Sequence, residues 1–488
     1  MKYIIIPILI IGILLTGCDA NNDNIGNYDI AIEDVNIVNV ENGEIQNNMT
    51  VIISDNQISS IGKTNNIRLS GTDNIVDGKG KYLIPGLWDM HTHLFNESAI
   101  RNVNYPLFVA NGIAGIRLMA ADCLDPPCED PNMTINQHRN LQNEISKGTL
   151  LGPRSILASY YINGALKGES TVLKPRTEEH GRELARLLKE RGVDFIKIYD
   201  ELTPEAYYGL IDEAKKLYLD FAGHVPLTMK SSEVSEAGQK SIEHCCDWNL
   251  FIECSELEDD MRTKIIEMFR MGKEGNMNVL SFEMLEVFDS IKCQNIYQLF
   301  KQNNTWFVPT LRLMEVVYPD APDWKQNPNA KYMPKGEFDY FANEYDSIIR
   351  NLWGSFHPKV EEKRRNIVSD MNEAGVGLLA GSDAGELGLI YGFSLHEELI
   401  SLQNAGLTPL EVLQTATINP AKYQNALDSS GTIEQGKVAD LILLNKNPLE
   451  DIRNTQEIEG VFTNDRYLNR KDLDSLLLVV ENYIKNEN

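Results

Sequence analysis

Positive charge is scarce in this chain. Lysine and arginine together number 45 against 71 aspartates and glutamates, which gives a formal net charge of −26 over 488 residues. Because contacts with the phosphate backbone dominate nucleic-acid binding, this balance argues against a nucleic-acid partner. Internal repeats and low-complexity tracts are also absent from the sequence. The length alone allows one large domain or two to three smaller ones.

The opening stretch, "MKYIIIPILIIGILLTGCDA", has one lysine before an unbroken apolar run that ends in small residues, a pattern typical of a secretory signal. Its end, "LLTGC", resembles a bacterial lipobox, in which cleavage leaves Cys18 as the lipid-bearing N-terminus. We expect residues 1–17 to be the signal peptide and the polar residues 18–29 to be a flexible tether. The sequence therefore predicts an exported protein, anchored by lipid at a bacterial membrane in the periplasm or on the cell surface. The alternative is an uncleaved N-terminal anchor helix.

Cysteine is sparse as well, and six of the seven cysteines follow Cys18. An exported protein can keep disulfides, and one bridge between Cys123 and Cys128 would close the short loop "CLDPPC". The others are equally compatible with free, small hydrophobic side chains; they are Cys245, Cys246, Cys254 and Cys293. The sequence does not decide the pairing.

The pattern of apolar and polar residues changes twice along the chain. Residues 30–84 alternate apolar and polar positions between turn residues, which predicts β structure. Between 85 and 429, short apolar strands alternate with amphipathic helices, the pattern of a parallel sheet. Eight such strands, from "LIPGLWDMHTH" to "GVGLLAGSDAG", predict a β/α barrel. Residues 430–488 return to β texture and end in a helix, so we expect one small β domain built from both chain ends.

Histidine is scarce too, with eight in the chain. His91 and His93 form "HTH" at the end of the first barrel strand, where positions i and i+2 face the same way. His224 ends the strand "FAGHVP", His244 ends "SIEHC", and Asp383 ends "LLAGSDAG". Functional groups of a β/α barrel collect at these carboxyl ends. Imidazoles with a carboxylate suit zinc and its neighbours, so the pattern predicts a metal site.

A lysine interrupts one of the apolar strands. In "DFIKIYD" (194–200), alternation places Lys197 on the same side as Phe195 and Tyr199. An ammonium group costs several kcal/mol to bury without a partner. Taken alone, Lys197 reads as a side chain that reaches solvent from a strand end. Beside five other strand-end residues of metal-binding type, it becomes a candidate for the same site.

This constellation resembles that of the amidohydrolase superfamily, in its carboxypeptidase-like and imidazolonepropionase-like branch. "YLIPGLWDMHTHL" is similar to the family's opening signature, and "FIKIYD", "AGHVP", "SIEH" and "AGSDAG" resemble its later strand ends. The stretch 396–451 follows the family's closing region almost throughout. The resemblance covers about residues 30–475. It implies a distorted (β/α)8 TIM barrel with a small β-sandwich domain made from both chain ends.

The resemblance also implies a site with two divalent metal ions, with zinc favoured. His91, His93 and Asp383 would bind the more buried ion, and His224 and His244 the second. Lys197 would carry CO2 as N6-carboxylysine and bridge both ions through its carbamate, since burial favours the neutral amine that takes up CO2. A hydroxide bridging the metals would attack the substrate carbonyl. Asp383 would accept its proton and deliver it to the leaving nitrogen.

The expected activity is hydrolysis of a C–N bond in a small molecule: an amide, a cyclic amide or a dipeptide. A lactonase or phosphoester hydrolase on the same two metals, and a non-catalytic binding lipoprotein, are the alternatives. Three further residues are weaker candidates for substrate contact: Tyr160, Tyr161 and His396. His396 is equally compatible with a surface position at a helix start. Sequence leaves the substrate, the metal identity and the oligomeric state open.

Overall fold

The computed structural model describes most of the chain between residues 23 and 486. The described ranges are 23–25, 28–70, 74–123, 133–164, 166, 169–244, 248–271, 283–317, 323–345 and 358–486. Residues 1–17, Cys18 and most of the expected tether lie outside them. Within the described part of the chain, no helix has the length and the hydropathy that crossing a membrane requires.

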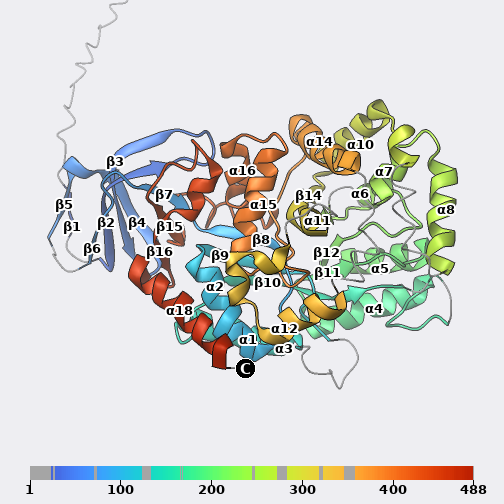
Figure 1. Cartoon of the computed structure of the whole chain (residues 1–488), viewed down its shortest axis with the longest axis horizontal. Helices are drawn as coiled ribbons and strands as arrows, with labels where there is room; N and C mark the ends of the chain where they lie inside the picture. The colour runs from blue at the N-terminus through green and yellow to red at the C-terminus, as the bar shows by residue number, and fades with distance from the viewer. Residues whose placement is uncertain are drawn as a thin grey trace, which may run out of the picture.

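Strands from both ends of the chain form one mixed sheet, seen as blue and red arrows on the left of Figure 1. Its order is β17-β16-β15-β7-β2-β3-β4, and β6 pairs with β2. The strands are β2 (Ile30–Val38), β3 (Ile45–Ser54), β4 (Gln57–Lys63), β6 (Ile75–Asp77), β7 (Tyr82–Pro85), β15 (Leu441–Leu444), β16 (Ile458–Thr463) and β17 (Arg466–Asn469). Antiparallel pairing of β7 with β15 joins the two chain ends. A separate short ladder pairs β1 (Asp23–Ile25) with β5 (Ile67–Leu69).

A second sheet of seven parallel strands curves into a nearly closed barrel. Its strands pair in chain order: β8 (Leu87–Thr92), β9 (Ile113–Leu118), β10 (Arg154–Ile162), β11 (Phe195–Ile198), β12 (Asp220–Gly223), β13 (Ser241–Glu243) and β14 (Trp306–Val308). Each corresponds to a strand that the sequence predicts. Strands that are neighbours in the sheet are also consecutive in the chain, as expected when each βα unit is added beside the one before it.

The eighth predicted strand, within 375–385, is an irregular extended segment rather than a regular strand. It nevertheless lies between the two edge strands of the barrel sheet. Phe307 N donates to Gly377 O at 2.8 Å on the β14 side, and Met90 N donates to Ala380 O at 2.9 Å on the β8 side. These backbone hydrogen bonds bring the segment that carries Asp383 next to the strand that carries His91.

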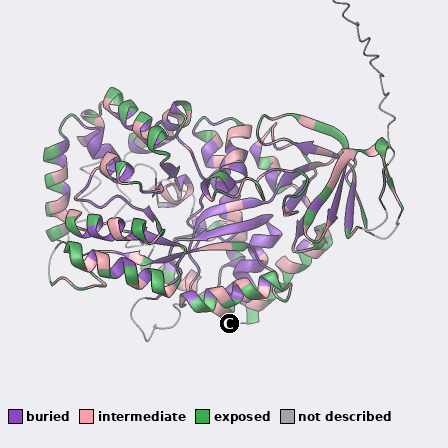
Figure 2. Cartoon of the chain, turned by 180° about the vertical axis from the view of Figure 1, so that it is seen from behind, coloured by how far each residue is buried: buried purple, intermediate pink, exposed green. Residues whose placement is uncertain are grey.

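Helices surround the barrel sheet, and their buried sides face inward (Figure 2). They are α1 (Glu97–Ala99), α2 (Tyr105–Ala110), α3 (Ile135–Ser146), α4 (Glu178–Arg191), α5 (Pro204–Lys216), α6 (Ser231–Glu236), α7 (Trp248–Glu253), α8 (Glu258–Met271), α10 (Ser290–Asn303), α11 (Leu311–Val317), α12 (Lys335–Tyr340), α14 (Pro358–Ala374), α15 (Phe393–Asn404), α16 (Pro409–Thr415), α17 (Ile418–Tyr423) and α18 (Arg470–Asn486). The last is the predicted C-terminal helix.

Local sequence explains why the helices flanking β11 begin and end where they do. The Thr177 side chain accepts a hydrogen bond from His180 N at the start of α4, and Gly192 ends that helix with φ 82°. Glycine adopts this left-handed conformation without the steric cost of a Cβ. Helix α5 starts with Pro204 after Thr203, whose side chain accepts from Ala206 N. These caps fix the length of the connections into and out of β11.

The alternation predicted for β11 is confirmed. Ile196 and Ile198 are fully buried in the large core that the strands share with the surrounding helices. Burying each of these side chains contributes about 1.5–3 kcal/mol. Phe195 belongs instead to a small cluster with Met119, Ala158 and Ala222, contributed by neighbouring barrel strands. The Phe195 face, which Lys197 shares, therefore points into the barrel.

One disulfide links Cys254, at the end of α7, to Cys293 in α10, 39 residues later. Cys123 is disulfide-bonded as well. Cys128, Cys245 and Cys246 lie outside the described residues, so the bridge considered for "CLDPPC" stays a prediction.

Candidate metal and active site

His91 and His93 aim their rings at one carboxylate. His91 belongs to β8 and His93 follows it directly; both are buried. His91 Nε2 lies 3.4 Å from Asp383 Oδ1, and His93 Nε2 lies 3.1 Å from the same oxygen. The i and i+2 positions thus converge on one point, as the "HTH" spacing predicts.

Asp383 reaches these histidines because its segment packs directly against β8. Asp383 N donates to His91 O at 2.8 Å. At Gly381 an added Cβ would lie 2.6 Å from Val308 Cγ1 and 2.7 Å from His91 Cβ. A larger residue there would push the segment away from the barrel strands. Glycine in "LLAGSDAG" is therefore needed for this close approach.

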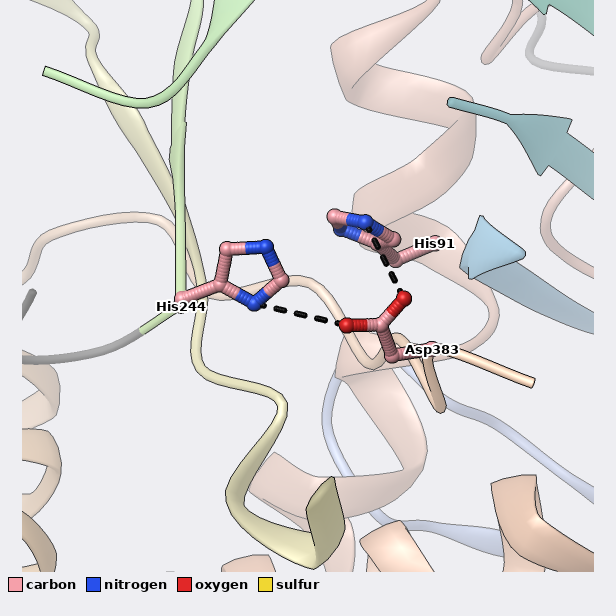
Figure 3. Close-up of side chains that lie close together, drawn as sticks. All are labelled: His91, His244 and Asp383. Atoms are coloured by element: carbon pink, nitrogen blue, oxygen red, sulfur yellow. Dashed lines mark ion pairs between the residues drawn. The ribbon is translucent and has the colours of Figure 1, made fainter. Parts of the chain in front are cut away.

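His244, at the end of β13, approaches the other oxygen of the same carboxylate. Its Nδ1 lies 3.6 Å from Asp383 Oδ2, and Figure 3 shows His91 and His244 each facing a different oxygen of Asp383. The rings of His91 and His244 have centroids 4.7 Å apart. His244 Nδ1 also lies 2.9 Å from Thr310 Oγ1. One ligand atom from each of His91, His244 and Asp383 falls within 4.8 Å of the others.

The backbone is strained at three of these strand ends. His244, Thr310 and Asp383 have φ values of 60°, 45° and 59°, in the left-handed region. Each such non-glycine residue costs on the order of 1–3 kcal/mol, which the surrounding structure must offset. Strain of this kind clusters at functional sites. Here it turns His244 and Asp383 toward the centre of the barrel.

His224, directly after β12, completes the group of histidines. Its ring centroid lies 4.8 Å from that of His244 and 4.3 Å from that of Tyr199. His224 Nδ1 lies 2.7 Å from Asp200 Oδ1. Burial raises the pKa of Asp200 to about 7, and the charge of Lys197 opposes this shift. A carboxylate partner at Nδ1 leaves Nε2 as the ring's free ligand atom.

Lys197 is 1% exposed. Burial lowers the pKa of its amine to about 8, against the opposing effect of carboxylates led by Glu243. Its charge in turn lowers the pKa values of His91, His224 and His244, after the larger effect of burial. Lys197 therefore lies among the histidines. Its readily lost proton distinguishes it from a surface lysine.

The donor atoms in this group fit a cation. The pKa values of His91, His224 and His244 lie well below the ordinary value, chiefly through burial, so these rings are neutral at pH 7. His91 Nε2 and Asp383 Oδ1 face each other at 3.4 Å, and neither has a hydrogen-bond partner among the described residues. His93 Nε2 lies near that oxygen without the alignment of a hydrogen bond. Buried acceptors left unpaired are costly, and a divalent metal would satisfy both.

The two tyrosines proposed for substrate contact lie at the end of β10. Tyr161 OH is 3.1 Å from His93 Nδ1, so Tyr161 contacts a candidate ligand directly. Tyr160 is 38% exposed and packs edge-on against Tyr161, with ring centroids 5.0 Å apart. The Tyr161 ring also packs at a tilt against Tyr199, with ring centroids 5.2 Å apart. The three rings form an aromatic wall beside the histidines.

The structure does not bring His396 to this group. His396 lies in α15 and is 2% exposed, so the alternative of a surface position is wrong. Its Nδ1 lies 3.0 Å from Thr455 Oγ1 and its Nε2 lies 3.0 Å from Asn111 O. Both ring nitrogens therefore contact polar atoms that lie outside the group of candidate ligands. Substrate contact through this imidazole has no support in these distances.

Several polar residues beneath the site were not identified from the sequence. Glu243 and Asp200 contact His91 and His224, and Arg117 pairs with Glu243. Arg117 interrupts the apolar strand "GIAGIRLMA" just as Lys197 interrupts "DFIKIYD". A basic residue within an apolar strand is the sequence feature that could have identified Arg117.

Comparison with known proteins agrees with this geometry. The Amidohydrolase family profile matches residues 82–467, which include every candidate ligand. Ochratoxinase of Aspergillus niger is 21% identical over 472 residues, covering 86% of this chain and 82% of its own.

Two solved structures are similar across nearly their whole length. A Xaa-Pro dipeptidase with methionine bound in its active site gives a TM-score of 0.62 at 20% identity, over 90% of this chain and 99% of that one. Bottromycin amidohydrolase gives a TM-score of 0.66 at 16% identity, over 93% and 90% of the two chains. At these identities the structures support the fold, while the profile match identifies the family. The chain is an enzyme of the amidohydrolase family.

Proposed function

We propose that this enzyme is a metal-dependent hydrolase of a C–N bond in a small amide, cyclic amide or dipeptide. The observation that carries the proposal is the pair of buried atoms His91 Nε2 and Asp383 Oδ1, which lie 3.4 Å apart and have no hydrogen-bond partner among the described residues. The names of the similar proteins point to the same class, since they include a dipeptidase and an amidohydrolase.

In this proposal His91, His93 and Asp383 hold one divalent ion, and His224 and His244 hold a second. Lys197 carries CO2 as a carbamate and bridges the two, because a buried amine with a pKa near 8 is readily available as the neutral nucleophile. The ligand set favours zinc. Metals bound there would polarise the scissile carbonyl and supply hydroxide near neutral pH. The finer architecture, a distorted (β/α)8 barrel with a β-sandwich, belongs to the same proposal.

Asp383 is the proposed general base. Burial raises its pKa, but its contact with His93 and the charge of Lys197 are among the effects that lower it by more, so the carboxylate stays ionised at neutral pH. It can therefore accept the proton of the attacking water and pass it to the leaving nitrogen. Tyr160 and Tyr161, on the aromatic wall, are proposed to contact the substrate.

The test is a turnover assay on matched libraries of dipeptides, N-acyl amino acids, cyclic amides, lactones and phosphoesters. Hydrolysis concentrated in the amide classes, and abolished by a chelator, is the expected result. Preference for lactones or phosphoesters would favour the alternative hydrolases. Absence of any turnover, with ligands still bound, would favour a binding lipoprotein. Turnover that survives complete metal removal would contradict the metal mechanism.

We also propose that the mature protein starts at Cys18 and is lipid-anchored after export. The disulfide between Cys254 and Cys293 supports an oxidising compartment. Labelled palmitate fed to expressing bacteria should enter the wild-type protein and not a Cys18→Ala variant. Equal labelling of the two proteins would refute lipidation at this cysteine.

A further inference from the structure

A wholly buried ion pair lies directly beneath the candidate metal site. Arg117, on β9, and Glu243, on β13, are both 0% exposed. Arg117 NH2 donates to Glu243 Oε1 at 2.8 Å and to Oε2 at 2.7 Å. Burying two charges is costly and is no evidence of stabilisation by itself. The pair therefore calls for an explanation beyond packing.

Glu243 has a second partner in the site. Its Oε2 lies 3.0 Å from His91 Nδ1, and its Oε1 accepts a hydrogen bond from Ser241 Oγ at 2.5 Å. A carboxylate held by an arginine only accepts hydrogen bonds, so the ring nitrogen facing it must carry the hydrogen. His91 is thereby confined to the tautomer with hydrogen on Nδ1. Its lone pair is then on Nε2, which faces Asp383 Oδ1 at 3.4 Å.

Arg117 is fixed by contacts from three other places. Its Nε donates to Met90 O at 2.6 Å, the carbonyl directly before His91. Its NH1 donates to Ser241 Oγ at 2.9 Å and to Tyr423 OH, on α17, at 2.8 Å. One guanidinium group therefore orients both the carboxylate and the strand that holds His91. A freely rotating side chain could not hold the Glu243 carboxylate and the His91 strand in a fixed relative position.

We propose that Glu243, held by Arg117, is a positioning residue that fixes the tautomer and ring direction of His91 for metal binding. The inference rests on the proposed metal function of the site. In this proposal the ion pair raises the metal affinity of the site, an effect that can be measured apart from any effect on folding. Carboxylates behind metal-bound histidines typically change metal affinity by about 10–100-fold when they are replaced.

The test compares two double variants that both lack the ion pair. Arg117→Met with Glu243→Gln keeps an oxygen that accepts from His91 Nδ1, whereas Arg117→Met with Glu243→Met keeps none. Neither leaves one member of the Arg117–Glu243 ion pair as a buried charge without the other. Co2+ affinity is measured by chelator competition and the visible Co2+ spectrum, and the thermal unfolding of metal-free protein is recorded alongside. Glu398→Gln is the matched control, because Glu398 is equally buried but binds Leu311 N and Arg312 N.

The glutamine double variant is expected to bind Co2+ at least about 10-fold more tightly than the methionine double variant. Both double variants are expected to unfold at similar temperatures. The Co2+ affinity of the control should stay within about twofold of wild type, because Glu398 hydrogen-bonds Leu311 N and Arg312 N and not a histidine. Equal Co2+ affinity of two folded double variants would overturn the inference while leaving the proposed function intact. Failure of the wild-type protein to bind Co2+ would overturn both.

A measurement on the unmodified chain covers the case in which the double variants do not fold. Solid-state NMR of metal-free protein labelled with 15N-histidine distinguishes the two imidazole tautomers. The His91 signals, identified by their loss in His91→Gln, should show hydrogen on Nδ1. Hydrogen on Nε2 would overturn the inference.

Discussion

Lys197→Ala should lower amide hydrolysis by roughly 10³-fold, the upper end of the effect of removing one electrostatic stabiliser from an active site. In the proposed site the lysine carbamate bridges the two metals, so its loss removes an anion that holds both ions. The measurement is kcat/KM on the best substrate found in the library, with added metal at saturation. Loss should persist at saturating metal, because no other described side chain replaces the bridge.

Two controls separate this effect from misfolding. Lys216→Ala removes a lysine from the exposed surface of neighbouring α5, where it pairs with Asp212, and should leave kcat/KM within about twofold, since surface ion pairs contribute little. Lys197→Met keeps the bulk of the side chain but cannot form a carbamate. It should be as inactive as Lys197→Ala, yet without metal it should be at least as stable as metal-free wild type, because a buried amine is replaced by an apolar group. Wild-type turnover in either Lys197 variant would refute the bridging role.

Asp383→Asn should lower kcat by about 10²–10⁴-fold, the range associated with a general acid–base residue. The amide keeps the shape of the carboxylate between His91 and His244 but cannot take up the proton of water. Stopped-assay kcat values at saturating metal and substrate provide the comparison. Because the pKa of Asp383 lies below its ordinary value, the wild-type base is ionised throughout the neutral range and is lost only as pH falls through that lowered pKa.

Asp220→Asn is the matched control for this variant. Asp220 starts β12 at the opposite end of the barrel strands and pairs with Lys240 Nζ at 2.6 Å, with its side chain 58% exposed. Its replacement should leave kcat unchanged within about twofold, as for other exposed ion pairs. If Asp383→Asn retained the wild-type kcat while binding metal normally, the proton-transfer role would belong to another group.

The residues that could be placed from the sequence are those whose positions follow from the local pattern of strands. Strand alternation puts Lys197 on the same face as Phe195 and Tyr199, and the parallel arrangement puts the candidate histidines at one end of the barrel. No knowledge of distant contacts is needed for either step. That is why the candidate ligands and the barrel strands could be predicted together.

The residues that sequence could not place depend on contacts between distant segments. Arg117 and Glu243 are separated by 126 positions and meet only because β9 and β13 lie across the barrel interior. His396 sits on a helix that could turn either face inward, and its packing against Thr455 depends on the C-terminal sheet domain. The segment around Asp383 approaches two barrel strands closely at Gly381, and no periodicity in the sequence reveals that approach.

Metal content per chain, measured on purified wild-type protein and on Lys197→Met side by side, tests the central claim most directly. The account predicts two divalent ions per wild-type chain after loading with zinc and bicarbonate, and loss of at least one of them in the variant. Equal metal content in the two proteins would contradict the bridging lysine. A wild-type chain that hydrolyses amides with no bound metal would contradict the metal site itself.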